Sequence, residues 1–181
     1  SRPLDWTGVP RAAREAWSSV FRHHDAATTH LLTAHGSPAF LTRLEHASLG
    51  LAQVPDHAAL RGIRRRAVAD VRRALAEGRV PPERVLADMQ RLQQTHPDMA
   101  SALLVAAWAL QAGGDRAAAV ETARAAARRA PRWADTHTAV GVFLLEAGEL
   151  GPADAAFRRA LAVAPGHAEA RQGRAEVARR R

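Results

Sequence analysis

The sequence predicts an all-α fold, an α-solenoid of stacked helix–turn–helix units, and three observations support this prediction. Pro97, Pro131 and Pro165 lie 34 residues apart, a period typical of helical hairpins that bury their apolar faces against one another. Residue types recur at matching positions between the prolines. No segment shows the alternation of apolar and polar residues, or the hairpin turns, that indicate β-strands.

Residues 1–54 do not follow this period, and we expect a helical extension that caps the N-terminal end of the stack. A first helix is expected from about Pro10 to Ala34, where apolar residues recur at helical spacing. A second helix is expected from Ser37 to about Leu51, because serine followed by proline is a typical N-cap and first-turn pair.

Residues 55–97 are expected to form an expanded, degenerate repeat unit. Its first helix should extend from Asp56, as N-cap, to Gly78, since glycine commonly ends helices. Its second helix should extend from Pro82 to about Thr95, because the proline that closes the unit prevents the helix from continuing.

Two full units, 100–133 and 134–167, match each other when the closing proline is counted as position 32. Positions 8, 11, 15, 20, 24 and 27 are Ala107, Leu110, Gly114, Ala119, Ala123 and Ala126 in the first unit and Gly141, Leu144, Gly148, Ala153, Phe157 and Ala160 in the second. Small residues let helix backbones approach closely, and larger apolar residues fill the space that remains. The pattern resembles the tetratricopeptide repeat (TPR), a helix–turn–helix family. Ala123 at position 24 and His137 at position 4 depart from it, because the family prefers larger apolar residues there.

The turns of the full units carry residues that end and begin helices. Gly114 and Gly148 should end the first helices, because a left-handed backbone suits glycine. The second helices should begin with Asp115 as a side-chain cap in one unit and at Gly151 and Pro152 in the other.

The last segment, residues 168–181, predicts a single capping helix with a polar outer surface, which such a stack needs at its end. We expect the repeat region, 55–181, to form one compact domain with the N-terminal extension. A chain of 181 residues is long enough to bury a continuous core.

Arginine supplies all 26 basic residues, and the formal net charge is +8. On the long helix that starts the unit 55–97, arginines gather opposite the apolar residues, which predicts a basic outer stripe. The stripe comprises Arg61, Arg65, Arg66, Arg72, Arg73 and Arg79. We expect a solvated face, with contact to an acidic partner, nucleic acid or anionic lipid as the alternative. Nucleic acid is disfavoured because no motif with interleaved aromatic residues accompanies the stripe.

No catalytic or metal-binding motif stands out. A phosphate-binding glycine loop and a G-x-S-x-G motif are missing, and the sequence contains no cysteine or tyrosine. Six histidines gather toward the N-terminus, but they lack the i, i+4 pairing of a helical zinc site. They are His23, His24, His30, His35, His46 and His57. We therefore expect neither an enzyme nor a metal site nor a cofactor.

No apolar run approaches the roughly 20 residues that span a bilayer. The sequence begins at Ser1, and we expect a processed or trimmed chain from which a targeting segment could be missing. We expect the bacterial cytoplasm or the periplasm as the compartment. The sequence predicts no particular oligomeric state.

The resemblance to TPR proteins implies a concave groove lined by positions 2, 5, 9 and 12 of each unit. These are Ser101, Leu104, Trp108, Gln111, Asp135, Thr138, Val142 and Leu145. The groove should be largely apolar, with Trp108 as an anchor for a partner helix or extended segment. The family's carboxylate clamp, with lysine at position 5 and asparagine at position 9, is missing. The alternative is a groove filled from within, by the N-terminal helix or by further units of a longer protein.

The leading functional hypothesis is a non-catalytic scaffold or adaptor that binds another protein or peptide, as TPR proteins of bacterial secretion, pilus and envelope assembly do. One alternative is the interaction region of a larger enzyme, such as a sulfotransferase or a glycosyltransferase. A weaker alternative is an arginine-rich binder of polyanions.

Overall fold

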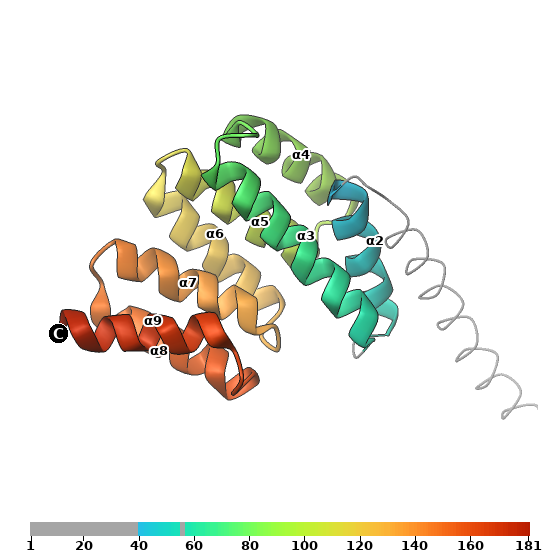
Figure 1. Cartoon of the computed structure of the whole chain (residues 1–181). Helices are drawn as coiled ribbons and strands as arrows, with labels where there is room; N and C mark the ends of the chain where they lie inside the picture. The colour runs from blue at the N-terminus through green and yellow to red at the C-terminus, as the bar shows by residue number, and fades with distance from the viewer. Residues whose placement is uncertain (1–39, 55–56) are drawn as a thin grey trace, which may run out of the picture. The chain divides into compact units, whose positions relative to one another are not determined.

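A computed structural model describes residues 40–54 and 57–181, and these ranges contain eight α-helices and no strand (Figure 1). The expected all-α fold is confirmed. The helix expected between Pro10 and Ala34 lies outside the described residues. The chain divides into two compact units, one ending at Ala67 and one extending from Val68 to Arg181. The boundary expected between Val54 and Pro55 stays a prediction.

The described part of the N-terminal unit consists of α2 (Phe40–Gln53) and the beginning of α3 (Ala58–Ala76). The two helices share a small apolar core of Ala47, Leu51, Leu60 and Ile63, against which Val54 packs. The N-cap expected at Asp56 lies outside the described residues. The Nδ1 atom of His57 lies 3.5 Å from the backbone N–H of Leu60, at the start of α3.

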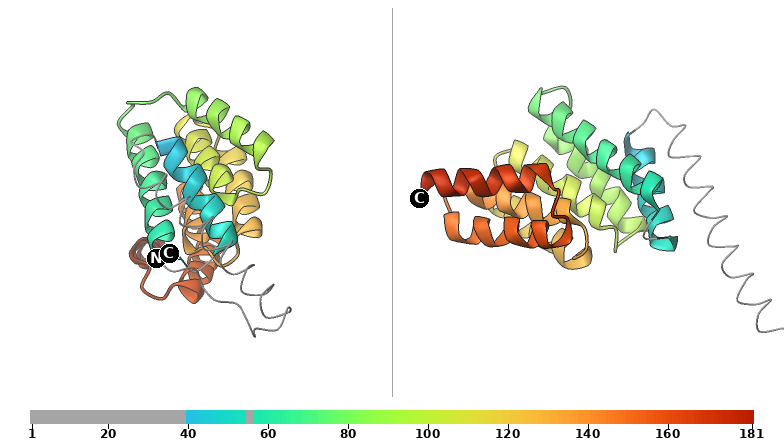
Figure 2. Two further views of the ribbon diagram at one scale, coloured as in Figure 1. Left: turned by 90° about the vertical axis from the view of Figure 1, so that its right-hand side faces the viewer. Right: turned by 60° about the horizontal axis from the view of Figure 1, so that its bottom comes forward.

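Within the C-terminal unit, helices recur with a strict period of 34 residues. After the end of α3 come α4 (Pro82–Thr95), α5 (Ala100–Ala112), α6 (Arg116–Arg129), α7 (Ala134–Glu146), α8 (Leu150–Val163) and α9 (Ala168–Arg180). The helices α4, α6 and α8 start 34 residues apart, and so do α5, α7 and α9. Antiparallel hairpins α5–α6 and α7–α8 pack side by side, and α9 packs on α7 and α8 (Figures 1 and 2). The degenerate repeat, residues 55–97, therefore has a second helix, α4, in the regular place, and its additional residues lie in and around its first helix, α3.

The turns follow the local chemistry of the sequence. Gly114 and Gly148 adopt φ angles of +89° and +82°, the left-handed conformation that glycine reaches at least cost. The Asp115 side chain accepts a hydrogen bond from the backbone N–H of Ala118, 3.1 Å away, as an N-cap does. The helix α8 begins at Leu150, one residue earlier than expected, and the Glu149 side chain makes no capping hydrogen bond.

The centre of the last hairpin is built around Phe157 of α8, which is completely buried. Its ring lies against two glycines, Gly141 on α7 and Gly173 on α9. A β-carbon built at Gly141 would lie 2.6 Å from the ring, and one built at Gly173 would lie 2.3 Å from it. Both distances are far below a normal carbon contact. The small residue at position 8 is thus explained, because the neighbouring ring occupies the space of a side chain.

Polar contacts attach α9 to the two helices before it. Arg174 of α9 donates from Nε to Asp154 of α8 at 2.9 Å, and this hydrogen bond lowers the pKa of the Asp154 carboxyl below its ordinary value. His167 lies between Asp135 on α7 and the backbone N–H of Ala170, at 3.0 and 3.3 Å. The imidazole therefore caps α9 through Nδ1, and its Nε2–H donates to Asp135.

Candidate functional site

The candidate site is centred on Trp108, a half-buried residue of α5. The guanidinium carbon of Arg72, on α3, lies 3.8 Å from the centre of the indole ring. Phe143 of α7 meets the same indole edge-on, with ring centres 4.6 Å apart. Arginine over tryptophan is a favourable cation–π geometry, and an edge-on aromatic pair is favourable as well. These two contacts hold the indole in a defined orientation.

Arg72 is fixed in turn by Glu169, the second residue of α9. Its Nη1 and Nη2 atoms donate to the two carboxylate oxygens at 3.1 and 2.7 Å. The two side chains are 33% and 37% exposed, so this fork contributes at most about 1 kcal/mol, and its main effect is to orient Arg72. The sequence placed Arg72 on a solvated outer stripe. The structure corrects this, because the guanidinium of Arg72 is stacked on Trp108 and paired with Glu169.

Beside the indole lies a cavity of about 440 Å³, which we call the Trp108 recess. It is lined by Ala69, Arg72, Arg73, Leu75, Ala76, Trp108, Gln111 and Ala112. Two sets of residues that the sequence separated meet here, the groove positions Trp108 and Gln111 and the stripe arginines Arg72 and Arg73. The lining of the recess therefore combines apolar side chains with two arginines.

Gln111 links the wall of the recess to α7. Its amide nitrogen donates to Glu146 of α7, whereas its amide oxygen is buried and has no hydrogen-bond partner among the described residues. A buried acceptor without a donor is costly. Because this oxygen is buried, it is not exposed to a partner in the recess, and Gln111 belongs to the wall that joins α5 to α7.

The structure places the other predicted groove residues at different depths. Ser101, Leu104, Thr138 and Leu145 are buried. Asp135 accepts hydrogen bonds from Trp133 and His167, and Val142 is half-buried. The groove positions that reach the recess are Trp108 and Gln111, and a binding role for the full set stays a prediction.

The other predicted anion-contacting arginines are also spread out. Arg61, Arg65, Arg66 and Arg73 are exposed. Arg79 lies beyond the end of α3, where its Nε donates to Glu77 at 2.5 Å. Sequence reasoning missed Glu169, which lies 97 residues from its partner Arg72, and no local pattern could have found this pair.

Residues 40–54 and 57–181 contain neither a side-chain cluster for a metal ion nor a helix that could cross a membrane. In these ranges no group of three or more histidine, aspartate or glutamate side chains is arranged to hold a metal ion. None of the helices described there combines the length and the apolar character needed to cross a bilayer.

Comparison with known proteins identifies the fold. No protein-family model and no curated protein matches this sequence. Among solved structures, the crystal structure of MamA, a TPR-type protein, superposes with a TM-score of 0.54 at 14% sequence identity. The match covers 86% of this chain and 82% of that one. At this identity the likeness concerns the fold alone, and it agrees with the TPR-like helical repeat seen in α4 to α9.

Proposed function

We propose that this chain is a non-catalytic protein-interaction scaffold, and that the Trp108 recess receives an apolar side chain from a partner's helix or extended segment. The observation that carries the proposal is a half-exposed tryptophan held by Arg72 at the edge of an open cavity. Tryptophan and arginine are the residue types that most often dominate binding energy at protein interfaces. A TPR-like repeat is a suitable frame, since such stacks present extended binding surfaces.

The lining indicates what kind of segment fits. Leu75, Ala69 and Ala76 offer apolar lining for a leucine or aromatic side chain. Arg73 is exposed and makes no ion pair within the described part of the chain, so an acidic neighbour of that side chain would face it. We therefore propose an amphipathic segment with one apolar anchor and a nearby carboxylate.

Selection from a displayed library of random peptides tests the proposal without knowledge of the natural partner. Peptides that bind the full chain are measured again on Trp108→Ala and Gln111→Ala, with Gln90→Ala, an exposed residue of α4, as the matched control. Removal of a dominant aromatic costs about 2 kcal/mol or more, which weakens binding at least about 30-fold. The control should bind like the wild type.

Circular dichroism shows whether each variant keeps its helices. If the selected peptides bind folded Trp108→Ala as tightly as the wild type, the recess is not the binding site. If no peptide is enriched on the wild-type chain, the scaffold proposal itself loses its support. The setting expected from the sequence, bacterial secretion, pilus or envelope assembly, belongs to the same proposal.

A further inference from the structure

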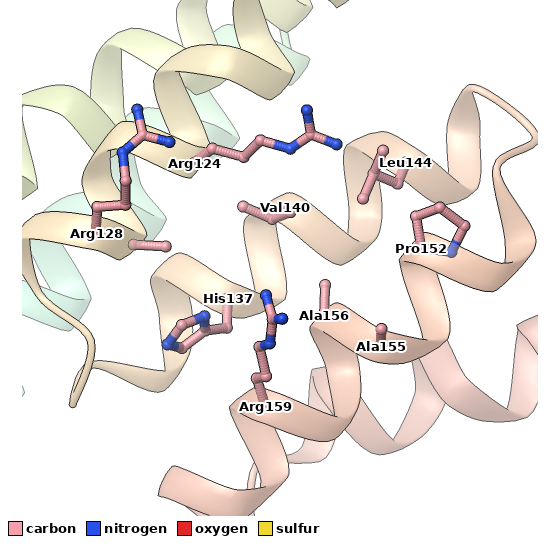
Figure 3. A pocket seen from close by; sticks show the side chains of 10 residues that line it. Arg124, Arg128, His137, Val140, Leu144, Pro152, Ala155, Ala156 and Arg159 are labelled. Atoms are coloured by element: carbon pink, nitrogen blue, oxygen red, sulfur yellow. The ribbon is translucent and has the colours of Figure 1, made fainter.

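A second cavity of about 440 Å³ lies among α6, α7 and α8 and shares no residue with the Trp108 recess (Figure 3). We call it the α6–α8 cavity. Its lining comprises Arg124, Ala127, Arg128, His137, Val140, Leu144, Pro152, Ala155, Ala156 and Arg159. Figure 3 shows Arg124 and Arg128 on the α6 side, with Arg159 reaching up from α8 beside His137.

The cavity carries positive charge that the described residues only partly balance. Arg124 pairs with Glu121 at 2.6 Å, on its own helix. Arg128 and Arg159 are exposed and have no ion pair or side-chain hydrogen bond within the described residues. No acidic side chain is among the ten that line the cavity. Two unpaired guanidinium groups from different helices therefore border one depression, and each presents a fork that fits a carboxylate.

Between the arginines lies an aliphatic floor. Val140 and Leu144 of α7 are largely buried, and Ala155 and Pro152 of α8 extend the floor toward the far end of the cavity. The lining includes no phenylalanine or tryptophan, so it offers no surface on which nucleic-acid bases could stack. His137 is the one aromatic side chain among the ten that line the cavity, and its Nε2 atom is hydrogen-bonded to the carbonyl oxygen of Pro131 at 2.9 Å.

We propose that the α6–α8 cavity is a second binding site, and that its ligand is an acidic peptide segment of a partner protein. Carboxylates of the segment pair with Arg128 and Arg159, and an aliphatic side chain between them packs on Val140 and Leu144. Charge complementarity selects this occupant, because the site combines cationic rims on two helices with an aliphatic floor. The site goes beyond the proposed recess function, since it binds through other residues.

The test uses the full chain and a labelled peptide in which glutamate alternates with leucine, with a glutamine–leucine peptide as the neutral control. Binding is measured by fluorescence anisotropy for the wild type and two double variants. Arg128→Gln with Arg159→Gln removes the unpaired charges of the cavity. Arg116→Gln with Arg132→Gln removes the same charge from two exposed arginines outside it, which also form no ion pair in the described ranges.

We expect the acidic peptide to bind the wild type and the neutral peptide to bind at least about tenfold more weakly, because hydrogen bonds between charged groups are the strong ones. The cavity variant should lose about tenfold or more for the acidic peptide, and the control variant less than about threefold. Ala155→Phe, which fills the floor without a change of charge, should also weaken binding. A glutamate–leucine peptide also matches the ligand proposed for the Trp108 recess, so the two double variants are measured again in a Trp108→Ala background. The loss caused by Arg128→Gln with Arg159→Gln should persist there, which separates the two sites.

Several results would overturn the proposal. Equal losses in the two double variants would show that the chain attracts acidic peptides through its net charge alone. If Ala155→Phe bound the acidic peptide as tightly as the wild type, the aliphatic floor would not take part in binding. If a single-stranded oligonucleotide bound more tightly than the peptide and depended on Arg128 and Arg159, the ligand would be a nucleic acid and not a peptide.

Discussion

The close contact between Gly141 and Phe157 predicts that Gly141→Ala destabilises the fold, although alanine favours helices. In an exposed helix the exchange would stabilise by about 1 kcal/mol. At this site the new β-carbon would lie 2.6 Å from two ring carbons, so the ring must move by about 1 Å to restore normal contact. Gly173 blocks that movement, because the ring already fills the space of its missing side chain.

Overpacking of this kind costs about 1–3 kcal/mol, and subtraction of the gain of about 1 kcal/mol in helix propensity leaves a net loss of up to about 2 kcal/mol. Urea unfolding followed by circular dichroism measures the change. The matched control is Gly151→Ala on α8, where a β-carbon would meet nothing within 4 Å, and stability should rise by up to about 1 kcal/mol.

A second substitution tests the cause. Phe157→Leu made in the Gly141→Ala background removes the clashing ring edge, so the double variant should be more stable than the sum of the single effects by about 1 kcal/mol or more. The reasoning is refuted if Gly141→Ala stabilises the chain as Gly151→Ala does, or if the two effects simply add.

Three further changes follow from other contacts and are measured by the same unfolding experiment. Asp154→Asn should cost about 0.5–1 kcal/mol at neutral pH. Arg174 lowers the folded-state pKa of Asp154, so this stabilisation is complete above the unfolded pKa of about 3.9 and is lost as pH falls through the lower folded value. If Asp154→Asn lowered the free energy of unfolding as much in acid as at neutral pH, this explanation would be contradicted. Asp115→Ala removes the cap of α6 and should cost about 1 kcal/mol, whereas Asp115→Asn should cost far less. Gly148→Ala forces a left-handed alanine and should cost about 1–2 kcal/mol, and a neutral result would show that the turn can rearrange.

The sequence determined the fold class, the period and most helix ends. Prolines stand two residues after the ends of α4, α6 and α8, and the glycines of the turns adopt the expected left-handed conformation. The Asp115 cap is equally local. These features were predictable because helix starts and stops depend on residues within one turn of each other. The start of α8 shows the limit of such local reasoning, because the helix begins at Leu150, one residue before Gly151.

Only the tertiary structure decided what the surfaces of the repeat offer. Position 9 predicted Trp108 as a groove residue, and that role stays a prediction. Arg72 and Glu169, which meet beside it, lie 97 residues apart in the sequence, so their contact depends on the packing of the whole unit. Leu104 occupies a predicted groove position yet is buried, because depth is set by the closeness of neighbouring helices and not by the position within a repeat. The α6–α8 cavity likewise needs three helices in place. The period of the chain therefore fixed which helices form, and the packing between them fixed which side chains remain available for binding.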